Sequence, residues 1–124
     1  MLDIGCGPGG MSKIAKKLDI SWKGIDGDFN LKGPNIIIHD FTTGPFKCDE
    51  KFDLGRSVEF LEHVDEQYIP NFMEAFKLCK RVVLTHALPN KFGYHHVNCQ
   101  RPNYWIDIFV DGGKVVGGSV VVVS

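Results

Sequence analysis

The chain has 124 residues, of which 44% are apolar, and a formal net charge of −1 from 14 basic and 15 acidic side chains. A chain of this length folds as one domain around a modest core, and its near-neutral charge excludes the basic surface that nucleic-acid binding requires. It has no apolar run of 18 residues and no charged signal sequence at its N-terminus. We therefore expect neither a membrane span nor secretion.

The cysteines indicate a reducing compartment. They are widely spaced and form neither a C-x-x-C pair nor another zinc-like arrangement. They stand at four positions, Cys6, Cys48, Cys79 and Cys99. Although an even number formally allows two disulfides, free thiols are the commoner state in an intracellular α/β domain. We expect a cytoplasmic protein with reduced cysteines.

The first ten residues predict a strand, a glycine turn and the start of a helix. Residues 1–4 have the apolar character of the end of a buried strand, and the glycines that follow let the backbone turn sharply and lie close against a ligand. Gly5, Gly7 and Gly10 fit the dinucleotide pattern G-x-G-x-x-G, which places a pyrophosphate at a helix N-terminus. This pattern alone is weak evidence for a nicotinamide cofactor.

The same stretch fits a second pattern, in which Asp3 lies in the strand end and glycines follow at every second position. Asp3 repels a pyrophosphate but attracts a ligand that carries an ammonium or sulfonium group. With Leu-Asp-Ile-Gly-Cys-Gly-Pro-Gly over residues 2–9, the chain resembles the class I S-adenosylmethionine-dependent methyltransferases, of the small-molecule type. The resemblance implies S-adenosyl-L-methionine as cofactor. Its methionyl part is then held by the strand-end acid and the turn, Asp3, Gly5, Cys6, Gly7 and Gly9.

An acid follows the second predicted strand. Residues 11–18 carry apolar side chains at helical spacing, and residues 20–25 predict a strand that ends in Asp26, Gly27 and Asp28. An acid in this place accepts hydrogen bonds from ribose hydroxyls. Because nicotinamide enzymes and methyltransferases share this device, Asp26 supports a nucleoside ligand without choosing between the two. Gly27 and Asp28 are further candidates, and an ordinary Asp-Gly turn is the alternative interpretation.

A third strand is predicted over residues 36–38, a short apolar run typical of parallel sheets. It is followed by Asp40 and Phe41, an acid and an aromatic ring suited to bond the exocyclic amine of adenine and to cover its face. In the resembled family an acid at this point contacts adenine, which implies that role for Asp40. Phe41 fits the adenine site and the core equally well.

A fourth strand is predicted over residues 52–57, followed by a short helical turn with Glu62 and His63. This segment resembles the fourth-strand segment of the family. Gly55 and Arg56 depart from it, because the family has apolar residues in the middle of this strand. The pair suggests a bulge, an exposed edge or a local loosening.

A fifth strand, over residues 82–85, follows an amphipathic helix over residues 66–79 that has Pro70 near its start. The loop over residues 86–98 then leaves the carboxyl edge of the sheet, where ligands bind in open α/β folds. No thiolate or carboxylate stands at matching spacing, so no metal is expected. Candidates for a general base are His63, His86 and His95; histidines bonded to the loop backbone are the alternative.

The C-terminal part predicts a helix over residues 100–109 and a β-prone run over residues 115–123 that glycines interrupt. We expect residues 120–123 to pair within the sheet or with another copy of the chain, as a homodimer. The resembled fold ends with two further strands, one of them antiparallel, and has a helix before its first strand. Against that pattern the chain looks cut short at both ends.

Taken together, these elements predict one domain over residues 1–124 with a doubly wound, mostly parallel α/β sheet in three αβα layers, incomplete at its ends. The resemblance implies an enzyme that transfers a methyl group to an O, N or C atom of a small molecule, with Ser57 and Val58 lining the cofactor groove. One alternative is a nicotinamide-dependent oxidoreductase, which gives no role to Asp3 or Asp40. Another is a truncated, non-catalytic domain that binds a nucleoside cofactor.

Overall fold

The computed structural model describes residues 1–89, 93, 96–111 and 118–123. His95 therefore lies outside the described residues. The strands are β1 (Leu2–Ile4), β2 (Lys23–Asp26), β3 (Ile36–Ile38), β4 (Phe52–Ser57), β5 (Cys79–Thr85) and β6 (Ser119–Val123). The helices are α1 (Gly10–Lys17), α2 (Ile69–Phe76) and α3 (Pro102–Asp111), with short 3₁₀ turns η1 (Leu61–His63) and η2 (Glu66–Tyr68). Within these ranges, every helix is too short or too polar to cross a membrane.

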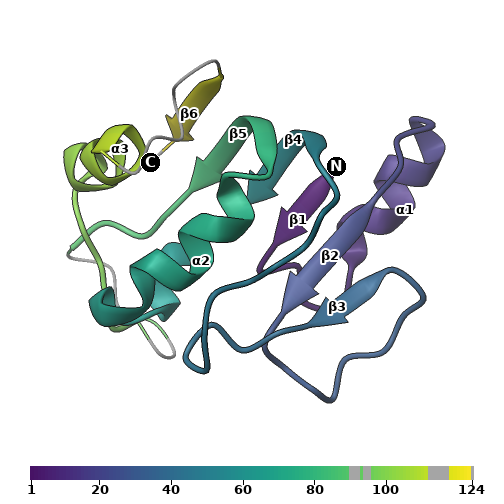
Figure 1. Ribbon diagram of the computed structural model, residues 1–124, viewed down its shortest axis with the longest axis horizontal. Coiled ribbons are helices and arrows are strands. Elements are labelled where there is room, and N and C mark those ends of the chain that lie inside the picture. Colours follow the sequence, from purple (N-terminus) through teal and green to yellow (C-terminus); the bar gives the residue numbers. More distant parts are fainter. Residues whose placement is uncertain (90–92, 94–95, 112–117, 124) are drawn as a thin grey trace.

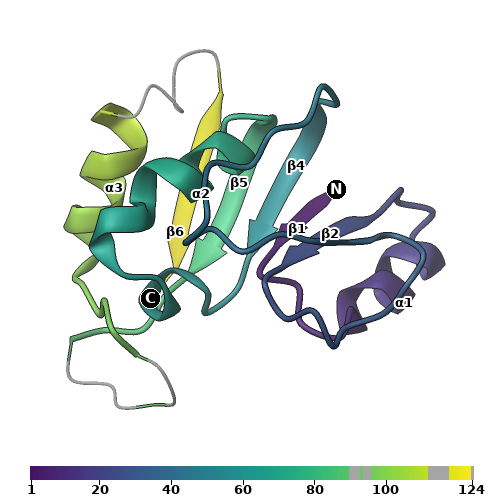
Figure 2. The ribbon, with the colours of Figure 1, turned by 60° about the horizontal axis from the view of Figure 1, so that its bottom comes forward.

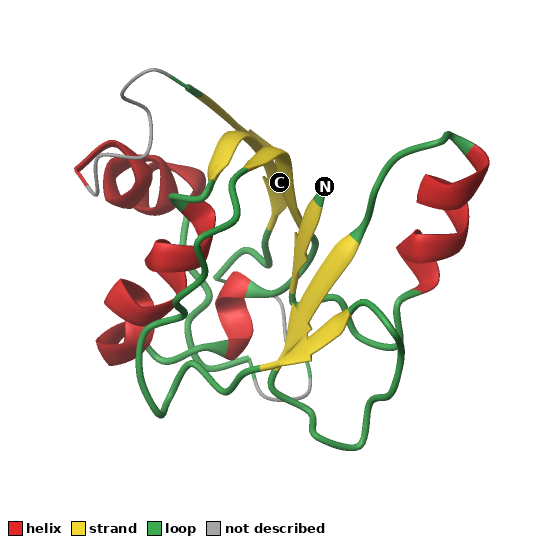
Figure 3. Cartoon of the chain, turned by 45° about the vertical axis from the view of Figure 1, so that its right-hand side comes forward, coloured by secondary structure: helices red, strands yellow, loops and turns green. Residues whose placement is uncertain are grey.

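The six strands form one sheet in the order β3-β2-β1-β4-β5-β6, and every pair of neighbours runs parallel (Figure 1). The chain moves outward from β1 to β3 and then returns to β4 on the other side of β1. Helix α1 covers one face of the sheet, and α2 and α3 cover the other (Figure 3). This arrangement confirms the predicted doubly wound α/β fold of the Rossmann type.

The resembled fold ends with two further strands, and the described part of the chain contains one strand at this place, β6. Strand β6 pairs in parallel with β5, from Arg81↔Ser119 to Thr85↔Val123. Helix α3 lies between the two strands in the chain, and a helical crossover brings the chain back to the same end of the sheet, so the next strand runs in the same direction. The valines thus pair within the sheet. Because β6 is also the last strand of the sheet, a homodimer through its outer side stays a prediction.

Several element boundaries differ from those expected; strand β2, for example, begins at Lys23 rather than Ile20. Strand β5 begins at Cys79 rather than Val82, because the charged side chains of Lys80 and Arg81 are exposed and do not interrupt the pairing with β4. Helix α2 begins only at Ile69, because residues 66–68 form the separate turn η2. Pro70 stands in the first turn of α2, as predicted.

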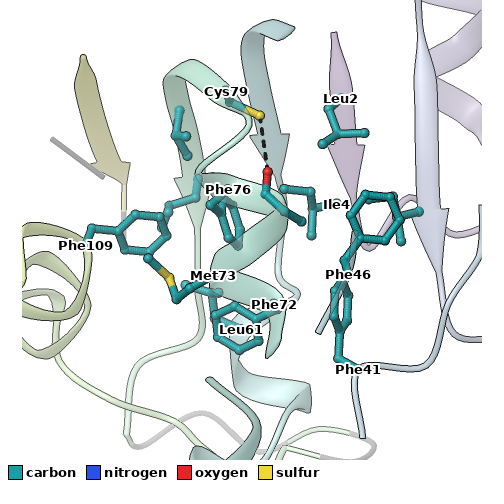
Figure 4. Close-up of a cluster of buried hydrophobic side chains, with 14 of the residues drawn as sticks. Leu2, Ile4, Phe41, Phe46, Leu61, Phe72, Met73, Phe76, Cys79 and Phe109 are labelled. Atoms are coloured by element: carbon teal, nitrogen blue, oxygen red, sulfur yellow. Dashed lines mark hydrogen bonds between the residues drawn. The ribbon is translucent and has the colours of Figure 1, made fainter. Parts of the chain in front are cut away.

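The core lies between the sheet and the helices α2 and α3, which cover one of its faces (Figure 4). A row of aromatic rings in edge-to-face contact runs through it, with centroids 6.2 Å apart for Phe41 and Phe72, 5.9 Å for Phe72 and Phe76, and 4.9 Å for Phe76 and Phe109. Such pairs add to the free energy of burying apolar surface. The row joins the segment after β3 to α2 and α3, and so fixes the loops that surround the site described below.

Strand β4 has no bulge, contrary to the expectation from Gly55 and Arg56. It pairs with β1 on one side and β5 on the other, in the middle of the sheet. Gly55 is required because a Cβ atom there would lie 2.7 Å from Sγ of Cys79. Arg56 is accommodated because its guanidinium binds the carboxylate of Asp3. Cys79 and Asp3 are distant from this pair in the sequence. The pair by itself therefore predicted a loosened strand, whereas the structure shows close packing.

The Gly55→Ala variant should lower the free energy of unfolding by about 1 to 3 kcal/mol, because the added methyl group must displace the buried Cys79 side chain. The double variant Gly55→Ala/Cys79→Ala should recover part of this loss, since it removes the displaced sulfur. Gly10→Ala is the matched control, because a Cβ atom there meets nothing within 4 Å. Urea denaturation measures all three; equal stability of Gly55→Ala and the parent would contradict the packing argument.

Candidate functional site

A cavity of about 900 Å³ opens at the carboxyl edge of the sheet, the edge that Figure 2 brings forward. Residues after four strands line it, among them Gly5 after β1, Asp26 at the end of β2, Asp40 after β3 and Phe60 after β4. Parallel strands bring their carboxyl ends to one edge, and the chain reverses its direction of winding between β1 and β4. Both the place and the size suit a small-molecule ligand.

The glycine turn after β1 is folded against the end of β2. Gly5, Gly7 and Gly9 have φ values of +76°, +57° and +87°, a region in which side chains are strained. The amides of Gly5 and Cys6 donate to the Ile25 carbonyl at 2.8 and 3.1 Å, and the Gly7 amide donates to Oδ2 of Asp26 at 2.9 Å. The Gly9 amide donates to the Cys6 carbonyl at 3.3 Å. These four amides are therefore used within the protein.

Asp26 is held in a fixed orientation at the cavity. Its Oδ2 accepts from the Gly7 amide and its Oδ1 accepts from the Asp28 amide at 3.0 Å. A carboxylate has about four acceptor positions, so both oxygens of the half-exposed Asp26 can still accept hydrogen bonds from a ligand. Gly27 and Asp28 also line the cavity, and the structure thus places all three predicted residues of this turn together.

Asp40 and Phe41 both line the cavity but differ in burial. Asp40 is exposed, and its Oδ1 accepts from the hydroxyl and the amide of Thr42 at 2.7 and 2.9 Å, which lowers the pKa of this carboxyl. Phe41 is only 5% exposed and packs edge to face on Phe60, with centroids 5.7 Å apart. Phe41 is therefore a core residue that also forms part of the cavity wall.

Acidic side chains dominate the lining. Among the described residues, five carboxylates line the cavity and no lysine or arginine does; the five are Asp26, Asp28, Asp40, Glu59 and Asp65. Like charges in a cleft add to one field, which attracts cations and repels anions. Glu59 and Asp65 were not identified from the sequence, because they lie in irregular chain after β4 where no spacing rule applies.

Asp3 does not line the cavity. It is fully buried, and both of its carboxylate oxygens accept from Nη1 of Arg56, at 3.0 and 3.1 Å. Nε1 of Trp22 donates to Oδ2 at 3.2 Å. Arg56 compensates the charge of Asp3. The negative charge at the cavity, which the sequence analysis assigned to Asp3, comes instead from the five exposed or half-exposed carboxylates of the lining.

Several other predicted residues also lie off the cavity lining. Ser57 is buried and its hydroxyl donates to the Ile4 carbonyl at 3.0 Å, while Val58 is 42% exposed. His86 is only 3% exposed, with its Nδ1 3.2 Å from the Ala87 carbonyl. Of the three histidines proposed as general base, only His63 lines the cavity within the described part of the chain.

The segment after β4 contributes residues that the sequence analysis did not identify as ligand-binding. Glu59 has a φ of +51°, and its amide donates to the Thr85 carbonyl at 3.2 Å and to the Thr85 hydroxyl at 3.1 Å. Phe60 and Tyr68 line the cavity. Non-glycine residues in this backbone region are uncommon and cluster at functional sites. Only the structure identifies Phe60, whose ring lies so close to Gly5 that a Cβ atom there would be 2.5 Å from it.

Comparison with known proteins agrees with this architecture. A family model described as a methyltransferase domain matches residues 2–86, more than half of the chain and the part that runs from β1 through β5. The fold and the match define a Rossmann-like methyltransferase domain. The chain belongs to this family, within the class I S-adenosylmethionine-dependent methyltransferases, as its first motif indicated. No curated protein and no solved structure shows a significant match.

Arg56→Met should lower the free energy of unfolding by about 3 kcal/mol, because it leaves the Asp3 carboxylate buried without a compensating charge. Lys23→Met is the matched control. It breaks the ion pair between Lys23 and Glu50, whose side chains are 33% and 51% exposed. The free energy of unfolding should fall by about 1 kcal/mol or less. Chemical denaturation at neutral pH compares the two, and equal losses would show that burial of Asp3 is not the cause.

Cys6 should react slowly with iodoacetamide at pH 8. Burial, followed by the charges of Asp26 and Asp3, raises the pKa of its thiol to about 12, and only the thiolate is the nucleophile. Cys48 is similarly half-buried and serves as the internal comparison. Mass spectrometry of the native protein after a timed reaction should find Cys48 modified before Cys6. Modification of Cys6 first would contradict this electrostatic environment.

Proposed function

We propose that the protein transfers the methyl group of S-adenosyl-L-methionine to an O, N or C atom of a small-molecule acceptor. The observation that carries this proposal is the charge of the cavity, which five carboxylates and no lysine or arginine line among the described residues. A cleft with this field favours a sulfonium cation and disfavours a phosphorylated ligand.

The residues at the cavity fit this cofactor. Asp26, fixed by the Gly7 and Asp28 amides, would accept hydrogen bonds from the ribose hydroxyls. Asp40, beside the aromatic wall of Phe41, would accept from the adenine amine. The methionyl part would lie at the glycine turn, where Gly5 borders the cavity. Asp3, which precedes that turn in β1, is held by its ion pair with Arg56.

The turn disfavours the nicotinamide alternative. A diphosphate requires backbone amides that point at it, whereas the amides of Gly5, Cys6, Gly7 and Gly9 donate to protein acceptors. It would also have to approach Asp26 and Asp28 without a basic side chain beside them in the lining. Both hydrogen bonding and charge therefore support the methyl-transfer class.

The bound cofactor would supply an activated methyl group, so the protein has to align an acceptor and, for many acceptors, remove a proton. His63 is exposed and lines the cavity, which makes it the candidate base in the described part of the chain. Phe60 and Tyr68 supply an apolar wall against which an acceptor would be oriented. The acidic lining disfavours polyanionic acceptors, and supports a neutral or cationic small molecule.

Calorimetric titration tests the proposal, with S-adenosylhomocysteine and NADH as competing ligands. We expect S-adenosylhomocysteine to bind and NADH to bind more weakly. Asp26→Ala should weaken S-adenosylhomocysteine about tenfold or more, because a charge-assisted hydrogen bond contributes about 1.5 to 3 kcal/mol. Asp53→Ala is the matched control, since Asp53 is an exposed acid of β4 that does not line the cavity.

Tighter binding of NADH, or an affinity that Asp26→Ala leaves unchanged, would contradict the proposal. Binding of S-adenosylhomocysteine without methyl transfer to any of a panel of hydroxyl and amine acceptors would instead support the non-catalytic alternative. Folding of each variant is checked by circular dichroism before titration, so that loss of binding is not confused with loss of structure.

A further inference from the structure

A second cluster of side chains lies beside the cavity, at the carboxyl ends of β4 and β5. It consists of Glu62 and His63, both in η1, and His96 from the segment after β5. Each residue offers one ligand atom, and these three atoms all lie within 4.8 Å of one another. The rings of His63 and His96 meet edge to face with centroids 4.8 Å apart. We expected no metal because no thiolate or carboxylate stands at matching spacing near the histidines of the loop; Glu62 and His63 lie 34 and 33 positions before His96.

The backbone holds these groups together. The amides of Val97 and Asn98 donate to the Glu62 carbonyl at 2.8 and 3.0 Å, which ties the segment with His96 to the turn η1. The Ala87 amide donates to Oε2 of Glu62 at 3.1 Å. Two parts of the chain after β5 thus meet η1 at Glu62, and the Glu62 side chain is fixed by a buried hydrogen bond.

Glu62 also has an unused acceptor. Its side chain is fully buried, and within the described part of the chain Oε1 has no hydrogen-bond partner. A buried carboxylate oxygen without a partner lowers the stability of the fold. A cation bound by this oxygen would offset that cost, and the two nearby imidazole rings supply further ligand atoms.

We propose that Glu62, His63 and His96 bind a divalent transition-metal ion. Two imidazole nitrogens and one carboxylate oxygen suit Zn²⁺, Co²⁺ or Fe²⁺, whereas Mg²⁺ and Ca²⁺ prefer oxygen ligands throughout. At bond lengths near 2.0 to 2.2 Å the ligand atoms would be roughly 3 to 3.5 Å apart. His63 is exposed, so rotation of its side chain would close the remaining distance.

An ion at this cluster would lie next to the proposed methyl-transfer site, because His63 also lines the cavity. With three protein ligands it keeps open positions for a small ligand, such as the hydroxyl oxygen of an acceptor. With the ion bound, His63 would be its ligand and not the general base. The proposed role of the ion, to orient an oxygen acceptor and make its hydroxyl more acidic, rests on the proposed function. Binding of the ion itself does not.

The experiment is a Co²⁺ titration of the full chain after removal of metals with a chelator and without cofactor. We expect one equivalent to bind with visible absorption bands, and Zn²⁺ to displace it. Glu62→Gln, His63→Gln and His96→Gln should each weaken Co²⁺ by at least about tenfold. Glu74→Gln is the matched control, because it removes an exposed carboxylate of α2 that pairs with Lys77.

Glu62→Gln keeps an oxygen that can accept from the Ala87 amide, and His63 is exposed, so both variants should fold. Should Glu62→Gln fail to fold, Co²⁺ binding by the two histidine variants tests the proposal. No stoichiometric Co²⁺ binding by the folded parent protein, or binding unchanged in both histidine variants, would overturn the proposal and leave a hydrogen-bonded cluster only. S-adenosylhomocysteine binding without Co²⁺ binding overturns this inference alone, whereas Co²⁺ binding without S-adenosylhomocysteine binding overturns only the proposed function.

Discussion

The attachment of the glycine turn to the end of β2 is the constraint on which the site depends. Three amides of the turn donate to β2, two to the Ile25 carbonyl and that of Gly7 to the Asp26 carboxylate. The turn after one strand and the acid at the end of the next therefore form a single rigid unit. The same bonds occupy the amides of Gly5, Cys6 and Gly7, so the proposed preference for a cationic ligand rests on side-chain charge.

Charge is distributed unevenly in a chain whose net charge is close to zero. None of the exposed lysines of α1 lines the cavity, while five carboxylates border it. Net charge describes solubility and long-range steering, but the local field depends on which side chains share one cleft. Asp3 illustrates the difference, because it belongs to the first motif and yet, paired with Arg56, contributes little net charge to the site.

Coverage of the sheet is unequal as well. Helices α2 and α3 pack on the face that carries the aromatic row, and α1 is the only described helix on the other face (Figure 3). The row anchors the chain on either side of η1, because Phe41 precedes it and Phe72 follows it. The loops around the cavity are thereby supported by core packing, while the strained backbone of the exposed Glu59 is held by the hydrogen bonds of its amide to Thr85.

The sequence by itself determined the elements and the acids that end the strands. Apolar runs, helical spacing and the glycine turn are local signals, and parallel strands necessarily bring Asp26 and Asp40 to one edge. Only the tertiary structure decided the pairing of Asp3 with Arg56, the close packing at Gly55, and the clustering of Glu62 with two histidines. The physical reason is that these contacts join residues about 25 to 55 positions apart in the chain. A local pattern of apolar residues predicts helices and strands, but it does not predict which distant side chains come into contact.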